Sequence, residues 1–115
     1  MTKSRHEIFR GIPLTPSPIV VGYNEVRAKN RADVLLNLRE SESGRVNPLL
    51  VVGTFGSGRT AAWTTDVAPH WCGGLVDWGK KRVKIRVRNG IEIEVGDLYV
   101  KFFSQLMKWL AKKSD

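Results

Sequence analysis

Two short apolar runs separated by glycines constrain the fold of this chain more than any other feature. The runs are Leu49–Val52 and Thr60–Thr64, and the glycines between them are Gly53, Gly56 and Gly58. Runs of this length, rich in Val, Leu, Ala and Trp, are typical of β-strands, and glycine supplies the backbone freedom that a tight reversal needs. The stretch predicts a central hairpin with strands over residues 49–55 and 59–65, followed by a polar and aromatic exit.

The bulk composition is that of a soluble globular domain. The 115 residues are 42% hydrophobic and 26% charged, and a chain of this size can bury a core without disulfides or metal. The single cysteine, Cys72, cannot form an internal disulfide, which fits a reducing compartment. Residues 1–11 lack the apolar core of a signal peptide, and no apolar run approaches the ~20 residues that cross a bilayer. We therefore expect one cytoplasmic domain over residues 1–115, with no membrane association.

The residues before the central hairpin predict an amino-terminal segment and a second hairpin. Residues 1–18 are expected to lie on the core through Ile8, Phe9 and Ile12. Residues 19–71 then form the sheet core, in which Ile19–Arg27 and Ala32–Arg39 are expected to pair as consecutive strands. In the second of these strands, alternation places three residues on one face and Leu35 on the other; the three are Val34, Leu36 and Leu38.

Residues 80–96 predict a basic hairpin. A two-residue turn at Asn89-Gly90 would set Val87 opposite Glu92 and mix the apolar and polar faces. A three-residue loop over residues 88–90, with Gly90 left-handed, keeps the faces separate, and face pattern determines register more strongly than turn preference does. This loop predicts the pairs Val87 with Ile91, Ile85 with Ile93, Arg86 with Glu92, and Lys84 with Glu94.

The net charge of +8 raises the possibility of a nucleic-acid partner. Four basic residues of the hairpin region lack an evident acidic partner in the sequence and are the candidate contacts: Lys80, Lys81, Arg82 and Arg88. The alternative is that the charge serves solubility alone, and Glu92 and Glu94 neutralise part of the basic strand across the hairpin. The sequence favours the second explanation.

Residues 97–113 predict the one helix of the chain. Asp97 is suited to the N-cap, and Lys112 and Lys113 suit the negative end of the helix dipole. Its apolar stripe consists of Tyr99, Phe102, Phe103, Leu106, Trp109 and Leu110. Such a stripe with lysines behind it could lie on a membrane surface, but packing against a sheet is the commoner use. We therefore expect an α+β fold: a mixed, largely antiparallel sheet with one C-terminal helix packed on it.

The exit of the central hairpin holds the side chains best suited to chemistry. Asp66, His70 and Cys72 lie close together in the sequence there, but Cys72 lacks the G-x-C-x-G context of a nucleophile at a strained elbow. One cysteine and two distant histidines do not make a three- or four-ligand metal site, so we expect neither metal nor cofactor. The glycines beside Arg59 lack the spacing of a phosphate-binding loop. The candidate ligand contacts are Asp66, His70, Trp71 and Arg59.

The central stretch also resembles a known family, the class I-like glutamine amidotransferase domains. Residues 47–71 read NPLLVVGTFGSGRTAAWTTDVAPHW, and the carboxy-terminal half of these domains has a similar PLLVVG strand, G-x-G-R turn and D-x-x-P-H-W loop. Residues 6–13, HEIFRGIP, resemble the H-P-I-F-R-G-I-P run that leads into that half, and Gly22-Tyr23-Asn24 resembles the segment between. FFSQLMKWLA, within the expected helix, resembles the closing helix of the family.

The resemblance implies a fragment of an α/β amidotransferase-like fold, covering its carboxy-terminal half only. The preceding units, which hold the nucleophile elbow of the family, have no counterpart here, and residues 83–95 resemble an insertion. His70 matches the histidine of the family's His-x-Glu pair, but Cys72 stands where the glutamate is needed. His70 is thus the one catalytic candidate, no triad is intact, and we expect no catalysis by the chain on its own. We expect it instead to assemble, as a homo-oligomer or with a separately encoded amino-terminal half.

Overall fold

The computed structural model describes residues 6–15, 18–20, 22–65, 73–86, 90 and 92–112 of the chain. Among these residues the secondary structure comprises two 3₁₀ helices, five strands and one α-helix. In chain order these are η1 (Glu7–Phe9), β1 (Asp33–Arg39), β2 (Val46–Phe55), β3 (Gly58–Trp63), η2 (Gly73–Asp77), β4 (Arg82–Arg86), β5 (Glu92–Gly96) and α2 (Asp97–Leu110).

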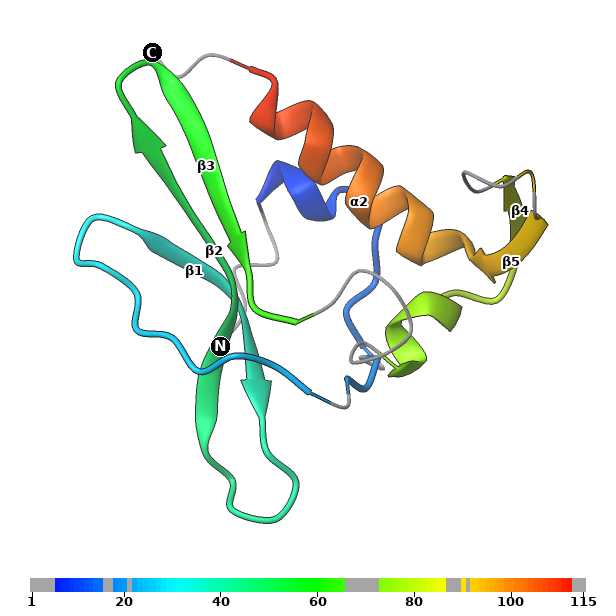
Figure 1. Ribbon diagram of the computed structural model, residues 1–115, viewed down its shortest axis with the longest axis horizontal. Coiled ribbons are helices and arrows are strands. Elements are labelled where there is room, and N and C mark those ends of the chain that lie inside the picture. The colour runs from blue at the N-terminus through cyan, green and yellow to red at the C-terminus, as the bar shows by residue number, and fades with distance from the viewer. Residues whose placement is uncertain are drawn as a thin grey trace.

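The strands form two antiparallel sheets, and α2 packs beside them (Figure 1). The larger sheet has the order β1-β2-β3, and the smaller one pairs β4 with β5. Within the described residues no helix is long or apolar enough to cross a membrane. The α+β class with one C-terminal helix is confirmed.

The central hairpin predicted from the sequence is present as β2 and β3. Its register pairs Val52 with Ala61 and Phe55 with Gly58, and Gly56 in the turn has a φ of 60°. Only a residue without a Cβ adopts that backbone conformation at little cost. The glycines between the two apolar runs therefore act as the sequence indicated.

The prediction that residues 19–27 and 32–39 form a hairpin is wrong. The described residues of 19–27 form no strand, and β1 pairs instead with the start of β2, for example Arg39 with Val46. The physical reason is the length of β2, whose ten residues extend beyond β3 and offer β1 a partner across a short loop. The segment that was expected to be a strand makes one backbone bond to the end of the hairpin, from Asn24 N to Thr64 O at 2.7 Å.

A register shift interrupts the ladder along β1 at the residues for which alternation was predicted. Leu35 is only 1% exposed, whereas Val34, Leu36 and Leu38 are half-buried. The pairing shifts between Val34 and Leu36, which leaves Leu35 without an opposite residue on β2. A bulge of this kind turns the extra residue out of strict alternation, and here it turns Leu35 into the core.

The basic hairpin has the predicted register. Lys84 lies opposite Glu94, Ile85 opposite Ile93 and Arg86 opposite Glu92. Gly90 has a φ of 75°, as a three-residue loop ending in a left-handed glycine requires. The expected pairing of Val87 with Ile91 falls outside the described residues.

The core lies where η1 and α2 meet the larger sheet. Its fully buried centre combines Phe102 of α2 with Ile8 of η1 and Leu50 of β2. Phe9 and Ile12 are buried with them, so the expected anchors of the amino-terminal segment are confirmed. The remaining buried members of this cluster are Leu35, Val52, Leu75, Trp78, Leu106 and Trp109.

The N-cap of η1 is His6, and the N-cap predicted for α2 is wrong. The Nδ1 atom of His6 accepts a hydrogen bond from the Ile8 amide at 3.2 Å. The N-cap of α2 is Gly96, and Asp97 begins the helix. The carboxylate of Asp97 is engaged elsewhere, accepting at Oδ1 from the Lys81 amide at 3.2 Å.

Candidate functional site

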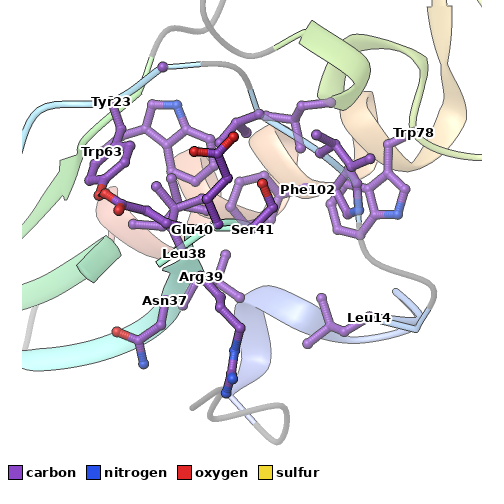
Figure 2. A pocket seen from close by; sticks show the side chains of 18 residues that line it. Leu14, Tyr23, Asn37, Leu38, Arg39, Glu40, Ser41, Trp63, Trp78 and Phe102 are labelled. Carbon is purple, nitrogen blue, oxygen red and sulfur yellow. The ribbon is translucent and has the colours of Figure 1, made fainter. Parts of the chain in front are cut away.

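A cavity that could hold a ligand opens between β1, η2 and the segment that precedes β1. It has a volume of about 800 Å³, and its wall combines apolar and polar side chains (Figure 2). Three aromatic residues from distant parts of the chain contribute, namely Trp63, Trp78 and Phe102. The polar side is made by Tyr23, Asn37, Arg39, Glu40, Ser41 and Glu42.

A hydrogen-bonded network fixes the polar side of this pocket. The Tyr23 hydroxyl donates to Glu40 Oε2 at 2.6 Å and accepts from Asn47 Nδ2 at 2.7 Å. Ser43 donates to the second carboxylate oxygen, Oε1 of Glu40, also at 2.6 Å. The carboxylate of Glu40 is thus held in one orientation in the wall of the pocket, because each of its oxygens accepts a short hydrogen bond.

The network shifts the pKa values of its two titratable groups in opposite directions. Hydrogen bonds from Ser43 and then Tyr23 stabilise the ionised carboxylate and lower the pKa of Glu40 below 4.5. The bond from its hydroxyl to Glu40, together with desolvation, raises the pKa of Tyr23 above 10.0. At neutral pH the pair therefore consists of a carboxylate acceptor and a phenol donor.

Replacing Glu40 with glutamine should lower the pKa of Tyr23 toward its ordinary value. The carboxylate of Glu40 opposes loss of the phenol proton, and an amide opposes it less. The contribution of Tyr23 to stability is complete below pH 10.0 and is lost as the pH rises through the raised pKa of the folded state. The contribution of Glu40 is present above pH 4.5 and is lost as the pH falls through the lowered pKa of the folded state. Titration of the Tyr23 ring by NMR checks this, with Glu42→Gln as control; an unchanged Tyr23 pKa in Glu40→Gln would contradict the network.

The exit of β3 lies against the same pocket. Thr64 and Thr65 are buried, and Thr64 Oγ1 donates to Pro48 O at 2.9 Å. Thr65 Oγ1 donates to the carbonyl oxygen of Gly22, a lining residue. The described chain stops at Thr65 and resumes at Gly73, and Leu75 of η2 lines the pocket as well. Four sequence candidates fall in the interval and so outside the described residues: Asp66, His70, Trp71 and Cys72.

Arg59, the remaining ligand candidate, is held by the C-terminal helix. Its NH1 donates to the Trp109 carbonyl oxygen at 3.2 Å, and its Cζ lies 4.7 Å from the centroid of the Trp109 ring. The guanidinium therefore has both a carbonyl acceptor and an aromatic face. Arg59 is on the inward side of β3 with Ala61 and Trp63, an alternation visible in the sequence, but its partner is 50 residues away. Its role in ligand binding remains a prediction.

The contact of Arg59 with α2 should contribute measurably to stability. Arg59→Ala removes both the cation–π contact and the charged hydrogen bond, and is expected to lower the free energy of unfolding by about 1–2 kcal/mol. Arg59→Lys keeps the charge but not the planar group, and is expected to recover only part of this loss. Urea denaturation of both variants measures the difference; equal stability of Arg59→Ala and the parent would show that the contact contributes nothing.

The basic hairpin has more acidic partners than the sequence indicated. Arg82, expected to lack one, pairs with Asp77 at 2.7 Å and also donates to the Glu94 carbonyl oxygen at 3.0 Å. Arg86 lies 3.6 Å from Glu92. Lys80 and Lys81 are exposed, and Arg88 is outside the described residues. The structure thus leaves a smaller uncompensated patch than the four candidates suggested.

Sequence reasoning missed the Tyr23–Glu40 pair, in which a phenol donates to a carboxylate at 2.6 Å. In the sequence, Tyr23 belongs to the family-like run Gly22-Tyr23-Asn24, and Glu40 directly follows the strand predicted over residues 32–39. In that part of the chain which the structure describes, no group of three or more His, Cys, Asp or Glu residues is arranged to hold a metal ion.

The comparison with protein families gives a match over most of the chain. A family model described as "Putative glutamine amidotransferase" matches residues 1–88 of the 115. The match includes the pocket residues from Leu14 to Trp78 and ends before β5 and α2. A search of curated proteins finds no match.

Proposed function

The chain belongs to the putative glutamine amidotransferase family, and from this membership we propose that it is a non-catalytic domain that acts through assembly. The partner is either a second copy or a separately encoded amino-terminal half of the family's fold. The proposal includes a ligand site at the pocket beside the β3 exit.

The observation that carries the proposal is the amount of surface that the chain exposes. Its accessible surface is 8325 Å². A compact monomer of 12.9 kDa is expected to expose about 6300 Å², so that the difference is about 2000 Å². A standard protein–protein interface buries about 800 Å² on each partner. One partner of ordinary size would therefore cover about two fifths of the excess.

Exposed apolar side chains support the same conclusion. Phe55 at the tip of the β2–β3 hairpin is 85% exposed, Ile19 at the pocket is 74% exposed, and Met107 on α2 is 59% exposed. Exposed apolar residues are ordinary when they are scattered, and these three lie in separate parts of the chain, so each is one candidate contact point for a partner.

We place the ligand site at the pocket because both ends of the interval 66–72 adjoin it. Thr65 is bonded to the pocket residue Gly22, and Leu75 contributes to the wall. The sequence candidates Asp66, His70 and Trp71 belong to this interval, and together with the Tyr23–Glu40 pair they would offer a ligand both charge and aromatic surface.

Size-exclusion chromatography with light scattering tests the assembly. The expected result is a mass that is a multiple of 12.9 kDa, or a stoichiometric second protein that co-purifies with the native chain. A monomer at micromolar concentration with no co-purifying protein would refute it.

A glutaminase assay tests the non-catalytic part separately. Purified chain should release no ammonia from glutamine above the rate of a blank, because the sequence has no cysteine at a nucleophile elbow. Turnover that His70→Ala abolishes would show that the chain is an enzyme.

The alternative, a nucleic-acid-binding module, requires salt-dependent affinity. The ion pairs of Arg82 and Arg86 leave Lys80, Lys81 and Arg88 as its main contacts. We expect no binding to duplex or single-stranded DNA that weakens steeply between two salt concentrations. Binding that does so, and that is lost in the Lys80→Ala, Lys81→Ala double variant, would favour the alternative.

A further inference from the structure

We propose that a second copy of this chain adds to the outer edge of β3, where the two β3 strands pair antiparallel and the two α2 helices meet across the two-fold axis. This inference rests on the proposed function, since it specifies the partner and the surface of the assembly. It concerns backbone groups of β3 and the flank of α2 next to them.

The outward edge of β3 has backbone groups available for pairing. Thr64 N donates to Leu49 O at 3.0 Å, so this opposite pair is a hydrogen-bonded one. Bonded and non-bonded pairs alternate along an antiparallel ladder, which directs the amides of Thr60 and Ala62 toward β2 and those of Arg59 and Ala61 away from it. Among the described residues, no backbone bond joins Arg59 or Ala61 to any segment other than β2.

The two edges of the larger sheet differ in how well they could accept a strand. β1 carries two register shifts and ends in the charged residues Asp33 and Arg39. Bulges and charges of this kind hinder the addition of a strand. β3 pairs in regular register, has no proline or lysine, and its only charged residue, Arg59, is held against Trp109. From Arg59 to Ala61 the edge of β3 is therefore the more open of the two.

The exposed side of α2 is divided into two flanks with different chemistry. The polar flank contacts the amino-terminal segment, because Lys101 Nζ donates to Gly11 O at 3.3 Å, Gln105 Nε2 to Ile8 O at 2.5 Å and Lys112 Nζ to Glu7 Oε2 at 2.6 Å. The opposite flank carries no charge. Its residues are Tyr99, Val100, Phe103, Ser104, Met107, Leu110 and Ala111.

The uncharged flank continues the surface at the edge of β3. Phe103 meets the β3 residue Trp63 edge-on at 5.3 Å between ring centroids, and Tyr99 packs against Phe103 at 5.2 Å. Met107, one turn beyond Phe103, is 59% exposed. Strand and helix also match in length, at about 20 Å for the six residues of β3 and about 21 Å for the fourteen of α2.

A second copy fits this surface because the surface is complementary to itself. A two-fold axis perpendicular to the sheet makes the paired β3 strands antiparallel and keeps both α2 helices on the same side of the joined sheet. The uncharged flanks then face each other, and the lysines of both helices stay on the far sides. An acidic partner would have no basic residue to meet on this flank, which favours an identical chain. The excess surface of about 2000 Å² exceeds the ~800 Å² that each protomer of a standard dimer buries.

Two substitutions test the surface. Met107→Lys places charge on the uncharged flank, and Ala61→Pro removes an outward amide without removing a bond to β2. Both should raise the dimer dissociation constant at least tenfold in light scattering and sedimentation. Val46→Lys, at an apolar residue that is 49% exposed at the start of β2, is the matched control and should leave it unchanged. Circular dichroism establishes whether each variant folds. If Ala61→Pro does not fold, the dissociation constant of Met107→Lys decides the result.

Amide exchange supplies a readout that is specific to the edge. The Ala61 amide should exchange more slowly as the concentration of the parent chain increases, whereas the Ala62 amide, bonded to β2, should be protected throughout. The inference would be overturned if Met107→Lys dimerised as well as the parent chain and if the Ala61 amide of the dimeric parent exchanged fast. The proposed assembly would still stand in that case, because the parent chain would be a dimer through another surface. A monomeric parent that co-purifies with another protein would do the same, and a monomer without any partner would overturn both.

Discussion

Replacing Gly96 with alanine is expected to lower the free energy of unfolding by at least about 3 kcal/mol. Gly96 ends β5 and caps α2, and the backbone of η2 passes directly against it. A Cβ on Gly96 would lie 2.6 Å from the carbonyl carbon of Asp77 and closer still to the carbonyl group of Trp78. These are backbone atoms, so no side-chain rotation can relieve the clash.

The clash would also disturb the start of α2. The Trp78 carbonyl oxygen accepts from the Leu98 amide at 3.0 Å and from the Tyr99 amide at 3.3 Å, which satisfies two donors of the first turn. Moving Trp78 away from a new methyl group would lengthen both bonds. Since small domains are stable by only about 5–15 kcal/mol, the loss is a large share of the total.

Urea denaturation followed by circular dichroism measures this effect, and Gly58→Ala is the matched control. Gly58 has no positive φ, and the nearest atom to its Cβ would be the Phe55 carbonyl oxygen at 3.4 Å, an ordinary contact. We expect Gly58→Ala to change stability by less than about 1 kcal/mol. Comparable stabilities of the two variants would mean that η2 does not pass against Gly96.

The sequence predicted those elements whose information is local. In β4 and β5, apolar and charged residues alternate with period two, and only one register keeps Ile85 opposite Ile93. In β2 and β3, the glycines mark the reversal and the apolar runs mark the strands. The family resemblance, too, rests on contiguous runs, and the family match over residues 1–88 confirms it for the runs within that range.

Features that depend on distant residues could not be predicted in the same way. Whether β1 pairs with the segment before it or the one after it depends on which segment lies closer in the fold, and both are apolar. The bulge at Leu35 arises from competition between strand pairing and burial in a core that includes Ile8 and Phe102. No periodicity in residues 33–39 reveals it.

The candidate site shows the same division. Arg59 is a candidate ligand contact because of its neighbours in the sequence, whereas in the fold its guanidinium contacts Trp109. Tyr23 and Glu40 are 17 residues apart, and nothing local indicates that they meet. Asp66, His70 and Trp71 lie outside the described residues and remain predictions, which the His70→Ala assay addresses directly.

Phe102→Ala is the second change for which a large effect is expected, a loss of about 3–5 kcal/mol in the free energy of unfolding. The Phe102 side chain is fully buried at the junction of the elements that make the fold. It stacks on Phe9 at 6.1 Å between ring centroids and contacts the rings of Trp63 at 5.4 Å and Trp78 at 6.1 Å. Removing the ring would leave a cavity between α2, η1 and β3. These elements cannot move inward to fill it, because each is held in place by other contacts.

The matched control for Phe102→Ala is Phe55→Ala, the same change at a ring that is 85% exposed. A solvent-facing ring has little packing to lose, so stability should change by less than about 0.5 kcal/mol. Phe102 also lines the pocket, and its removal would join the new cavity to that space. An apolar fluorescent probe should therefore bind Phe102→Ala more strongly than the parent under conditions in which both are folded. If instead Phe55→Ala were the more costly change, the packing of α2 on the larger sheet would not be what holds this domain together.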